Sequence, residues 1–149
     1  MEVGAVTREP HPHHRIGRVL KRAEQALLDA KSAALKPVGL TLAQYVALAE
    51  LDHQPGITGA SLARASLVTP QAMMVVLKSL EDHGLITRVP HERHANVLEL
   101  HLTGAGREAL AAGHKAVAPV ERRVFDAFSI RELDQLSALL TRWIQAIEA

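Results

Sequence analysis

The chain has 149 residues, of which 48% are apolar but only 3% are aromatic, and its formal net charge is +1. This length suits one well-cored domain, and a core built from Leu, Val, Ile and Ala favours helices over a β-sandwich. The absence of cysteine excludes disulfides, thiol redox chemistry and cysteine-ligated zinc. The net charge is too small to indicate nucleic-acid binding by itself, so the distribution of charge has to decide that question.

Residues 1–12 are polar and contain Pro10 and Pro12, which predicts a flexible N-terminal arm before a single domain of residues 13–149. The arm has neither the basic start nor the apolar segment of a signal peptide. No run in the chain reaches the roughly 18 apolar residues of a membrane span. We therefore expect a cytoplasmic protein without membrane contact.

Two helices are predicted before residue 56. Apolar residues recur every three or four positions from about His13 to Leu35, which is typical of a long amphipathic helix. Thr41 and Gln44 form a capping-box pattern that opens the second helix, and Pro55 begins the turn that follows it.

Two shorter helices then follow in close succession. Thr58 can cap the first, and Thr69 can cap the second, with Pro70 at its first helical position. One face of the second helix is apolar and carries Met73, Val76, Leu77 and Leu80. Its opposite face carries Gln71, Met74, Val75 and Lys78. Gly84 is placed to take the left-handed conformation that ends the helix.

Strand patterns come next, at Ile86–Pro90 and Val97–Thr103, separated by the polar loop His91–Asn96. The second run alternates, with Leu98, Leu100 and Leu102 on one face and Glu99 and His101 on the other. Two short helices followed by a β-hairpin are the layout of a winged helix-turn-helix. Its second helix enters the DNA major groove, and its wing reaches the neighbouring backbone or minor groove.

Two further helices complete the predicted fold, which is mainly α with a small β-hairpin wing. Thr103 can cap a helix that runs to roughly Ala127, and Ser129 with Glu132 is a capping box that opens the last helix. We expect the last helix to bury Leu133, Leu136, Leu140, Trp143, Ile144 and Ile147.

The outer helices predict a homodimer. Residues 13–36 and 104–149 carry apolar stripes that a winged-helix lobe of about residues 40–103 cannot cover, so they are assigned to dimerisation. A twofold dimer presents two equivalent reading helices about one DNA turn, roughly 34 Å, apart, which predicts a pseudo-palindromic operator in double-stranded DNA.

The reading helix supplies most of the expected DNA contacts. Thr69, Pro70 and Gln71 lie at its N-terminus, where free backbone N–H groups and the helix dipole favour a phosphate. Gln71 can pair with adenine, and Lys78 can reach a phosphate or guanine. An exposed apolar pair, Met74 and Val75, suits contacts to thymine methyl groups.

The wing supplies the remaining expected contacts. Arg93 suits the negative potential of a narrow minor groove, while His91 and His94 add positive charge below about pH 6.5. Arg88 is expected at the interface mainly as a brace of the hairpin, through a pair with Glu92. The cations of residues 57–103 are balanced by acids, which predicts modest and salt-sensitive affinity: Arg64, Lys78, Arg88 and Arg93 stand against Glu81, Asp82, Glu92 and Glu99.

The order and local residues resemble the MarR family of bacterial transcription regulators. The resemblance rests on the strings Thr41–Tyr45, Leu62–Ala63, Leu80–Arg88 and Leu102–Gly106. It implies a homodimer whose first and last helices interlock, and a repressor released by a ligand or oxidant. The family commonly has an arginine near the site of Val75, and an aspartate and arginines where this chain has His94, Ala95 and Asn96.

A small anionic or phenolic effector is implied by the same resemblance, bound between the first helix, the second helix and the base of the reading lobe, near Arg15, Arg18 or Tyr45. No cofactor is expected, and no nucleophile, phosphate-loop or metal-spacing motif suggests an enzyme. Two alternatives stay open: a winged-helix module for protein interaction without specific DNA binding, and a metal-responsive regulator built on histidines such as His11, His13 and His14. The second is weak because Pro12 lies among these residues, and His114 stands alone on its helix.

Overall fold

The structure, a computed structural model, describes residues 14–149; the predicted arm of residues 1–12 lies outside the described residues. The elements in chain order are α1 (His14–Leu35), the 3-10 turn η1 (Lys36–Val38), α2 (Leu42–His53), α3 (Gly59–Ala65), α4 (Pro70–Asp82), β1 (Ile86–Pro90), β2 (Leu98–Leu102), α5 (Gly104–Asp126) and α6 (Ile130–Glu148). The predicted fold class, mainly helical with a hairpin wing, is confirmed.

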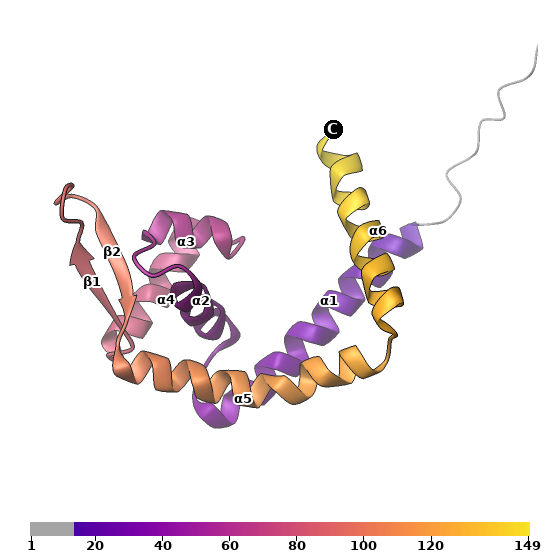
Figure 1. The fold of residues 1–149 in the computed structure, drawn as a ribbon, viewed down its shortest axis with the longest axis horizontal. Helices are drawn as coiled ribbons and strands as arrows, with labels where there is room; N and C mark the ends of the chain where they lie inside the picture. Colours follow the sequence, from indigo (N-terminus) through magenta and orange to yellow (C-terminus); the bar gives the residue numbers. More distant parts are fainter. Residues whose placement is uncertain (1–13) are drawn as a thin grey trace, which may run out of the picture.

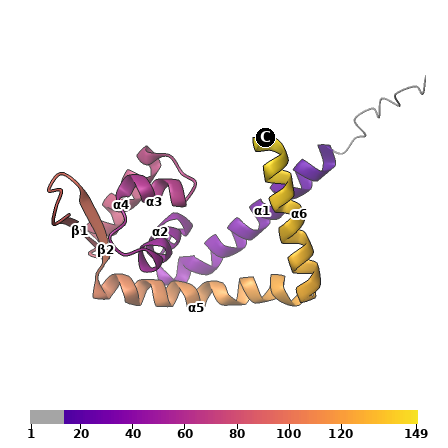
Figure 2. The same ribbon diagram turned by 45° about the horizontal axis from the view of Figure 1, so that its top comes forward.

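The chain forms an open, elongated shape (Figures 1 and 2). The long helix α5 joins a lobe of α2, α3, α4 and the hairpin at one end to α6 at the other, and α1 packs beside α5. The hairpin stands at the outer edge of the lobe, next to α4.

The predicted helix starts are confirmed by their hydrogen bonds. At α2, Thr41 Oγ1 accepts the Gln44 N–H at 3.1 Å while Gln44 Oε1 accepts the Thr41 N–H at 2.9 Å. A second capping box, formed by Ser129 and Glu132, opens α6. Gly84 takes the expected left-handed conformation, with φ +69°. Local sequence therefore sets the boundaries of these helices.

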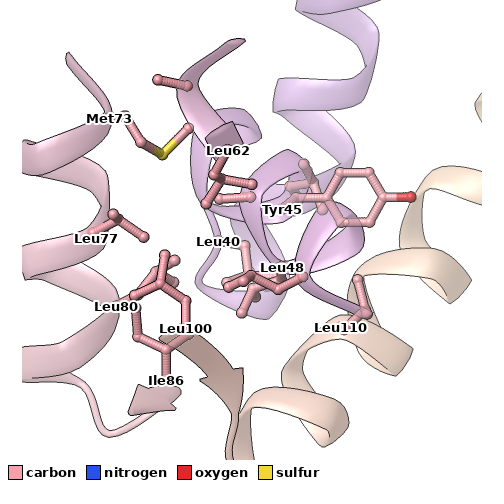
Figure 3. Close-up of a cluster of buried hydrophobic side chains, with 14 of the residues drawn as sticks. Leu40, Tyr45, Leu48, Leu62, Met73, Leu77, Leu80, Ile86, Leu100 and Leu110 are labelled. Carbon is pink, nitrogen blue, oxygen red and sulfur yellow. The ribbon is translucent and has the colours of Figure 1, made fainter. Parts of the chain in front are cut away.

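The core belongs to the lobe, to the end of α1 and to the face of α5 that packs against them. Its fully buried large side chains come from α1, α2, α3, α4, β2 and α5: Leu35, Leu48, Leu51, Leu62, Leu77, Leu80, Leu100 and Val117. Figure 3 shows the labelled members of this cluster converging from α4, β1 and β2 onto α2 and α5. A close-packed lobe holds α4 and the wing in fixed relative positions.

The wing is an antiparallel pair with Ile86 opposite Leu102 and Pro90 opposite Leu98. Residues 56 and 57 extend it on the other side of β2, since the Gly56 N–H donates to Leu100 O at 3.0 Å and the Leu100 N–H donates to Ile57 O at 3.1 Å. The predicted apolar face of β2 is buried only at its base. Leu100 is buried, whereas Leu98 is 42% exposed because the hairpin projects beyond the core.

Two glycines let α5 approach the lobe closely. A Cβ at Gly106 would lie 2.0 Å from the carbonyl oxygen of Leu85, and a Cβ at Gly113 would lie 2.8 Å from Cδ2 of Tyr45. Real Cβ atoms do not make contacts this short. Gly106 and Gly113 are therefore required by packing between α5 and the lobe.

The expected burial of the α6 stripe is wrong for a single chain. None of the predicted side chains is buried, and Ile147 is 72% exposed. The reason is geometric, because α6 folds away from the lobe and meets no packed face within the described chain (Figure 1). A largely apolar groove of about 700 Å³ instead separates α6 from α1, lined by Ile16, Val19, Leu20, Ala23, Leu136, Leu139, Leu140, Arg142, Trp143 and Ala146.

Candidate nucleic-acid interface

The N-terminus of α4 is open and capped as predicted. Thr69 Oγ1 accepts the Ala72 N–H at 3.1 Å, and Pro70 occupies the first turn. Thr69, Pro70 and Gln71 are exposed. Leu67, in the turn that precedes the helix, is 93% exposed at φ +54°, a conformation that bulky residues rarely adopt. Leu67 was not among the residues predicted from the sequence to contact DNA.

The exposed face of α4 has the composition that the sequence predicts. Met74 is 66% exposed and Val75 is 72% exposed, while Met73 and Leu77 are buried on the opposite side. Gln71 and Lys78 are also exposed and lie on the same side of the helix as Val75. An apolar patch flanked by one amide and one ammonium group therefore faces away from the lobe.

Lys78 is not free on this face. Its Nζ lies 3.0 Å from Oδ2 of Asp82, one helical turn further on. Both side chains are largely exposed, so the pair is weak and a phosphate can compete for the ammonium group. The i, i+4 spacing was a signal that sequence reasoning could have used to find this pair.

Arg88 braces the hairpin, but not through the predicted partner. Its Nε lies 3.0 Å from Oε2 of Glu81, so the pair links β1 to α4. The expected pair with Glu92 is wrong because register places Arg88 opposite Leu100, on the side of the hairpin next to α4. Arg88 therefore orients the wing relative to the reading helix.

The wing loop presents Arg93 and His94 to solvent, with His91 half-buried. The His91 and His94 rings lie 5.4 Å apart between centroids. His91 Nε2 lies 3.6 Å from Oε1 of Glu99, and His101 Nε2 lies 3.2 Å from Oε2 of the same carboxylate. Sequence reasoning placed Glu99 and His101 on one face of the strand but did not connect them with His91.

Two of the three predicted ligand residues, Arg18 and Tyr45, have side chains that the structure describes. Tyr45 is buried, and its hydroxyl oxygen lies 2.9 Å from Nδ1 of His114, which makes His114 part of a contact between α2 and α5. Burial raises the pKa of Tyr45, and the charge of Glu121 raises this pKa further. Arg18 is exposed, and the side chain of Arg15 lies outside the described residues.

A different hollow lies where the effector was expected, between α1, α2 and the base of the reading lobe. Its volume is about 590 Å³, and it is lined by Glu24, Leu28, Leu42, Ala43, Val46, Ser66, Leu67, Val68, Ala72, Met73 and Val76. Ser66 Oγ is buried and has no hydrogen-bond partner within the described chain. The hollow therefore offers an apolar wall, one free hydroxyl group and one carboxylate.

No three His, Cys, Asp or Glu side chains are arranged to hold a metal ion among the side chains that the structure describes, which begin at residue 16. The side chains of His11, His13 and His14, on which the metal hypothesis rests, lie outside the described ones. In the same part of the chain no single helix is long and apolar enough to cross a membrane; α3 and α4, bent by 113°, meet that criterion only when taken together.

Comparison with known proteins shows where this arrangement occurs. A family model described as the MarR family matches residues 38–95. The HTH-type transcriptional repressor Rv2887 of Mycobacterium tuberculosis is 35% identical over 127 residues, which cover 85% of this chain and 91% of the relative.

Solved structures of Rv2887 agree with this match. Its structure in complex with DNA matches with a TM-score of 0.68 at 35% identity, covering 85% of this chain and 95% of that chain. Its structure in complex with salicylic acid matches with the same TM-score at 32% identity, covering 93% and 99% respectively. Sequence and fold agree over most of both proteins, and the chain belongs to the MarR family of winged helix-turn-helix transcriptional regulators.

Proposed function

We propose that this chain is a homodimeric transcriptional repressor that binds a pseudo-palindromic operator in double-stranded DNA and is released by a small ligand. The observation that carries the proposal is the exposed face of α4, a helix with an open, capped N-terminus. The chain is also 35% identical to a repressor whose structure was solved with DNA. The lobe of about residues 40–103 reads DNA in this proposal, and residues 13–36 and 104–149 form the dimer.

The reading helix enters the major groove with its N-terminus first. The backbone N–H groups near Thr69 bind a phosphate, and Gln71 pairs with an adenine. Met74 and Val75 contact thymine methyl groups, which suits their exposure of 66% and 72%. Lys78 exchanges Asp82 for a phosphate.

The wing contacts the adjacent backbone or minor groove. Arg93 makes this contact, because it is exposed in the wing loop and forms no ion pair within the described residues. His91 and His94 flank it, and Arg88 holds the hairpin against α4 through Glu81.

Dimerisation uses the apolar surfaces of α1 and α6. Ile144 and Ile147 are 54% and 72% exposed, and the groove between the two helices is almost wholly apolar. A second copy covers these surfaces, since isolated chains rarely expose so much contiguous apolar area. This placement explains why α6 buries none of its stripe within one chain.

The effector binds in the 590 Å³ hollow beneath α4. Its apolar wall suits an aromatic ring, and Ser66 Oγ can bond a phenolic hydroxyl group. Glu24 is the ionisable residue in the lining, and its negative charge repels a carboxylate ligand. A neutral phenol therefore suits this hollow better than a carboxylate does. Because Met73 and Val76 belong to α4, a bound ring displaces the reading helix.

Selection from a random-sequence DNA library, followed by fluorescence anisotropy, tests DNA recognition. The enriched duplex should bind with at least about 1000-fold preference over a scrambled duplex. Gln71→Ala should weaken binding to the enriched duplex by about 5- to 100-fold. The matched control Gln135→Ala, on the exposed surface of α6, should not. Equal affinity for enriched and scrambled DNA would contradict the proposal and favour a protein-interaction module.

Ligand binding is tested by thermal shift with simple phenols and salicylic acid. Ala43→Leu narrows the hollow and should remove the stabilisation, while Ala60→Leu on α3, outside the hollow, should retain it. Absence of any shift across the panel would contradict this site.

A further inference from the structure

The carboxylate of Glu99 lies between two histidines of the wing. Its Oε1 is 3.6 Å from Nε2 of His91, at the start of the wing loop, and its Oε2 is 3.2 Å from Nε2 of His101, on β2. The three side chains are between 28% and 38% exposed. One acidic residue therefore contacts both the strand and the loop.

His91 in turn contacts the tip of the wing. The backbone N–H of Arg93 donates to Nδ1 of His91 at 3.0 Å. In this contact Nδ1 of His91 is the acceptor, because the backbone N–H of Arg93 can only donate. Nε2 is the nitrogen that faces Glu99. The Glu99 carboxylate and the Arg93 N–H therefore approach opposite nitrogens of the same ring.

Two backbone hydrogen bonds close the base of the wing loop. The His91 N–H donates to Val97 O, and the Val97 N–H donates to His94 O, both at 2.8 Å. These bonds hold the two ends of the loop together without the side chain of His91. The bond from the Arg93 N–H to His91 adds a constraint at the tip, where the guanidinium group leaves the loop.

The charged groups around this cluster are engaged elsewhere or are exposed. Glu92 and Arg93 line the same hollow as His91 and Glu99. On the packed elements, Arg88 pairs with Glu81, Arg64 bonds Ser61, and Arg107 donates to Leu102 O. Helix α2 ends at Asp52 and His53, which are both exposed. Within residues 14–149, only the two histidines contact the Glu99 carboxylate as cation-forming groups.

We propose that Glu99 is a positioning residue for DNA binding: through His91 it fixes the backbone of Arg93, so that the arginine points at the DNA in a set direction. This inference rests on the proposed function, because it needs Arg93 to touch DNA. A preformed wing tip lowers the entropy lost when the arginine is ordered on the phosphates or in the minor groove. Glu99 itself does not touch DNA.

A double-mutant cycle on the full-length chain tests this coupling, with the duplex enriched from a random library as the probe. At pH 7.5, Glu99→Gln should weaken binding by about 2- to 5-fold, because it removes the negative charge that faces Nε2 of His91 at 3.6 Å. In the Arg93→Ala background the same change should have no further effect. Glu92→Gln is the matched control, because it removes the same charge from the wing without touching His91, and it should leave binding equal or tighter.

Simple electrostatics makes the opposite prediction for Glu99→Gln, since loss of a negative charge near DNA tightens binding. Tighter or unchanged binding, or losses that multiply with those of Arg93→Ala at pH 7.5, would overturn the proposal. If no duplex is enriched over scrambled DNA, the proposed function fails instead, and the two failures are thereby distinguished.

A conservative variant separates positioning from folding. His91→Asn places an amide oxygen near the position of Nδ1, so it can accept the Arg93 N–H. It should bind DNA more tightly than His91→Ala, which should lose at least as much affinity as Glu99→Gln. Equal losses in the Asn and Ala variants would contradict the role of Nδ1.

Discussion

The variant Gly106→Ala tests how closely α5 packs against the lobe. The new Cβ would meet the Leu85 carbonyl oxygen at 2.0 Å, and this atom belongs to the backbone, so it cannot turn aside as a side chain would. Relief requires α5 to shift by about 1 Å or more. The shift separates Thr103 from the lobe, where its N–H donates to Leu85 O at 3.0 Å and its Oγ1 donates to Gly84 O at 2.7 Å.

The expected loss of stability follows from these contacts. Each of the two hydrogen bonds contributes about 1 kcal/mol, and overpacking adds about 1–3 kcal/mol. The higher helix propensity of alanine relative to glycine offsets about 1 kcal/mol of this loss of stability. The net destabilisation is about 2–4 kcal/mol, which corresponds to a fall in Tm of roughly 6–12 °C for a domain of this size.

Urea denaturation followed by circular dichroism measures this difference, at one fixed protein concentration because dimerisation contributes to stability. Gly104→Ala is the matched control: it lies in the same turn, and a Cβ there meets nothing within 4 Å. The control should be as stable as the parent or slightly more so. A Gly106→Ala variant that matches the control would refute the packing argument.

Three further changes probe the interface and its support. Asp82→Asn frees Lys78 and removes a negative charge from the reading face, so DNA affinity by anisotropy should rise by about 3- to 10-fold at low salt. Replacing contacted thymines by deoxyuridine should weaken DNA binding by the parent chain by about 2- to 5-fold per methyl group. The same replacement should weaken binding by the Val75→Ala variant less, because this variant has lost the side chain that contacts the methyl group. Tyr45→Phe removes the bond to His114 and should lower the free energy of unfolding by about 1 kcal/mol at pH 7. Because burial raises the pKa of Tyr45 above 10.0, its stabilising effect is complete below pH 10 and lost as the pH rises further, so the variant should be less sensitive to alkali.

The controls for these changes lie outside the interface. Asp134→Asn, on the exposed surface of α6, should leave DNA affinity unchanged. Equal binding to thymine and deoxyuridine duplexes would contradict methyl recognition but leave sequence-specific binding intact. If the free energy of unfolding of Tyr45→Phe falls as steeply in alkali as that of the parent, ionisation of Tyr45 does not contribute to the loss of stability at high pH.

Local signals in the sequence predicted most of the secondary structure. The cap residues Thr41, Thr58, Thr69, Thr103 and Ser129 all precede their helices as expected, because a cap depends only on residues within the next turn. The exposed face of α4 was predicted for a similar reason. Helical periodicity separates the buried stripe from Met74 and Val75 without knowledge of what covers the stripe.

Contacts across the fold were harder to predict. Arg88 was paired with Glu92, four residues away, but strand register directs it to Glu81 on α4. Tyr45 and His114 are 69 residues apart, so no spacing rule connects them. The effector residues suggested by resemblance do not line the hollow found beneath α4.

The sequence by itself determined where helices begin, which face of α4 is exposed, and that the outer helices carry more apolar surface than one lobe can cover. These properties depend on residues within one or two turns of each other. Only the tertiary structure decided that α6 folds away from the lobe, that Gly106 and Gly113 must be glycine, and that Glu99 lies between His91 and His101. Such features depend on how distant segments pack, and packing is set by the shapes of both surfaces rather than by the pattern along either one.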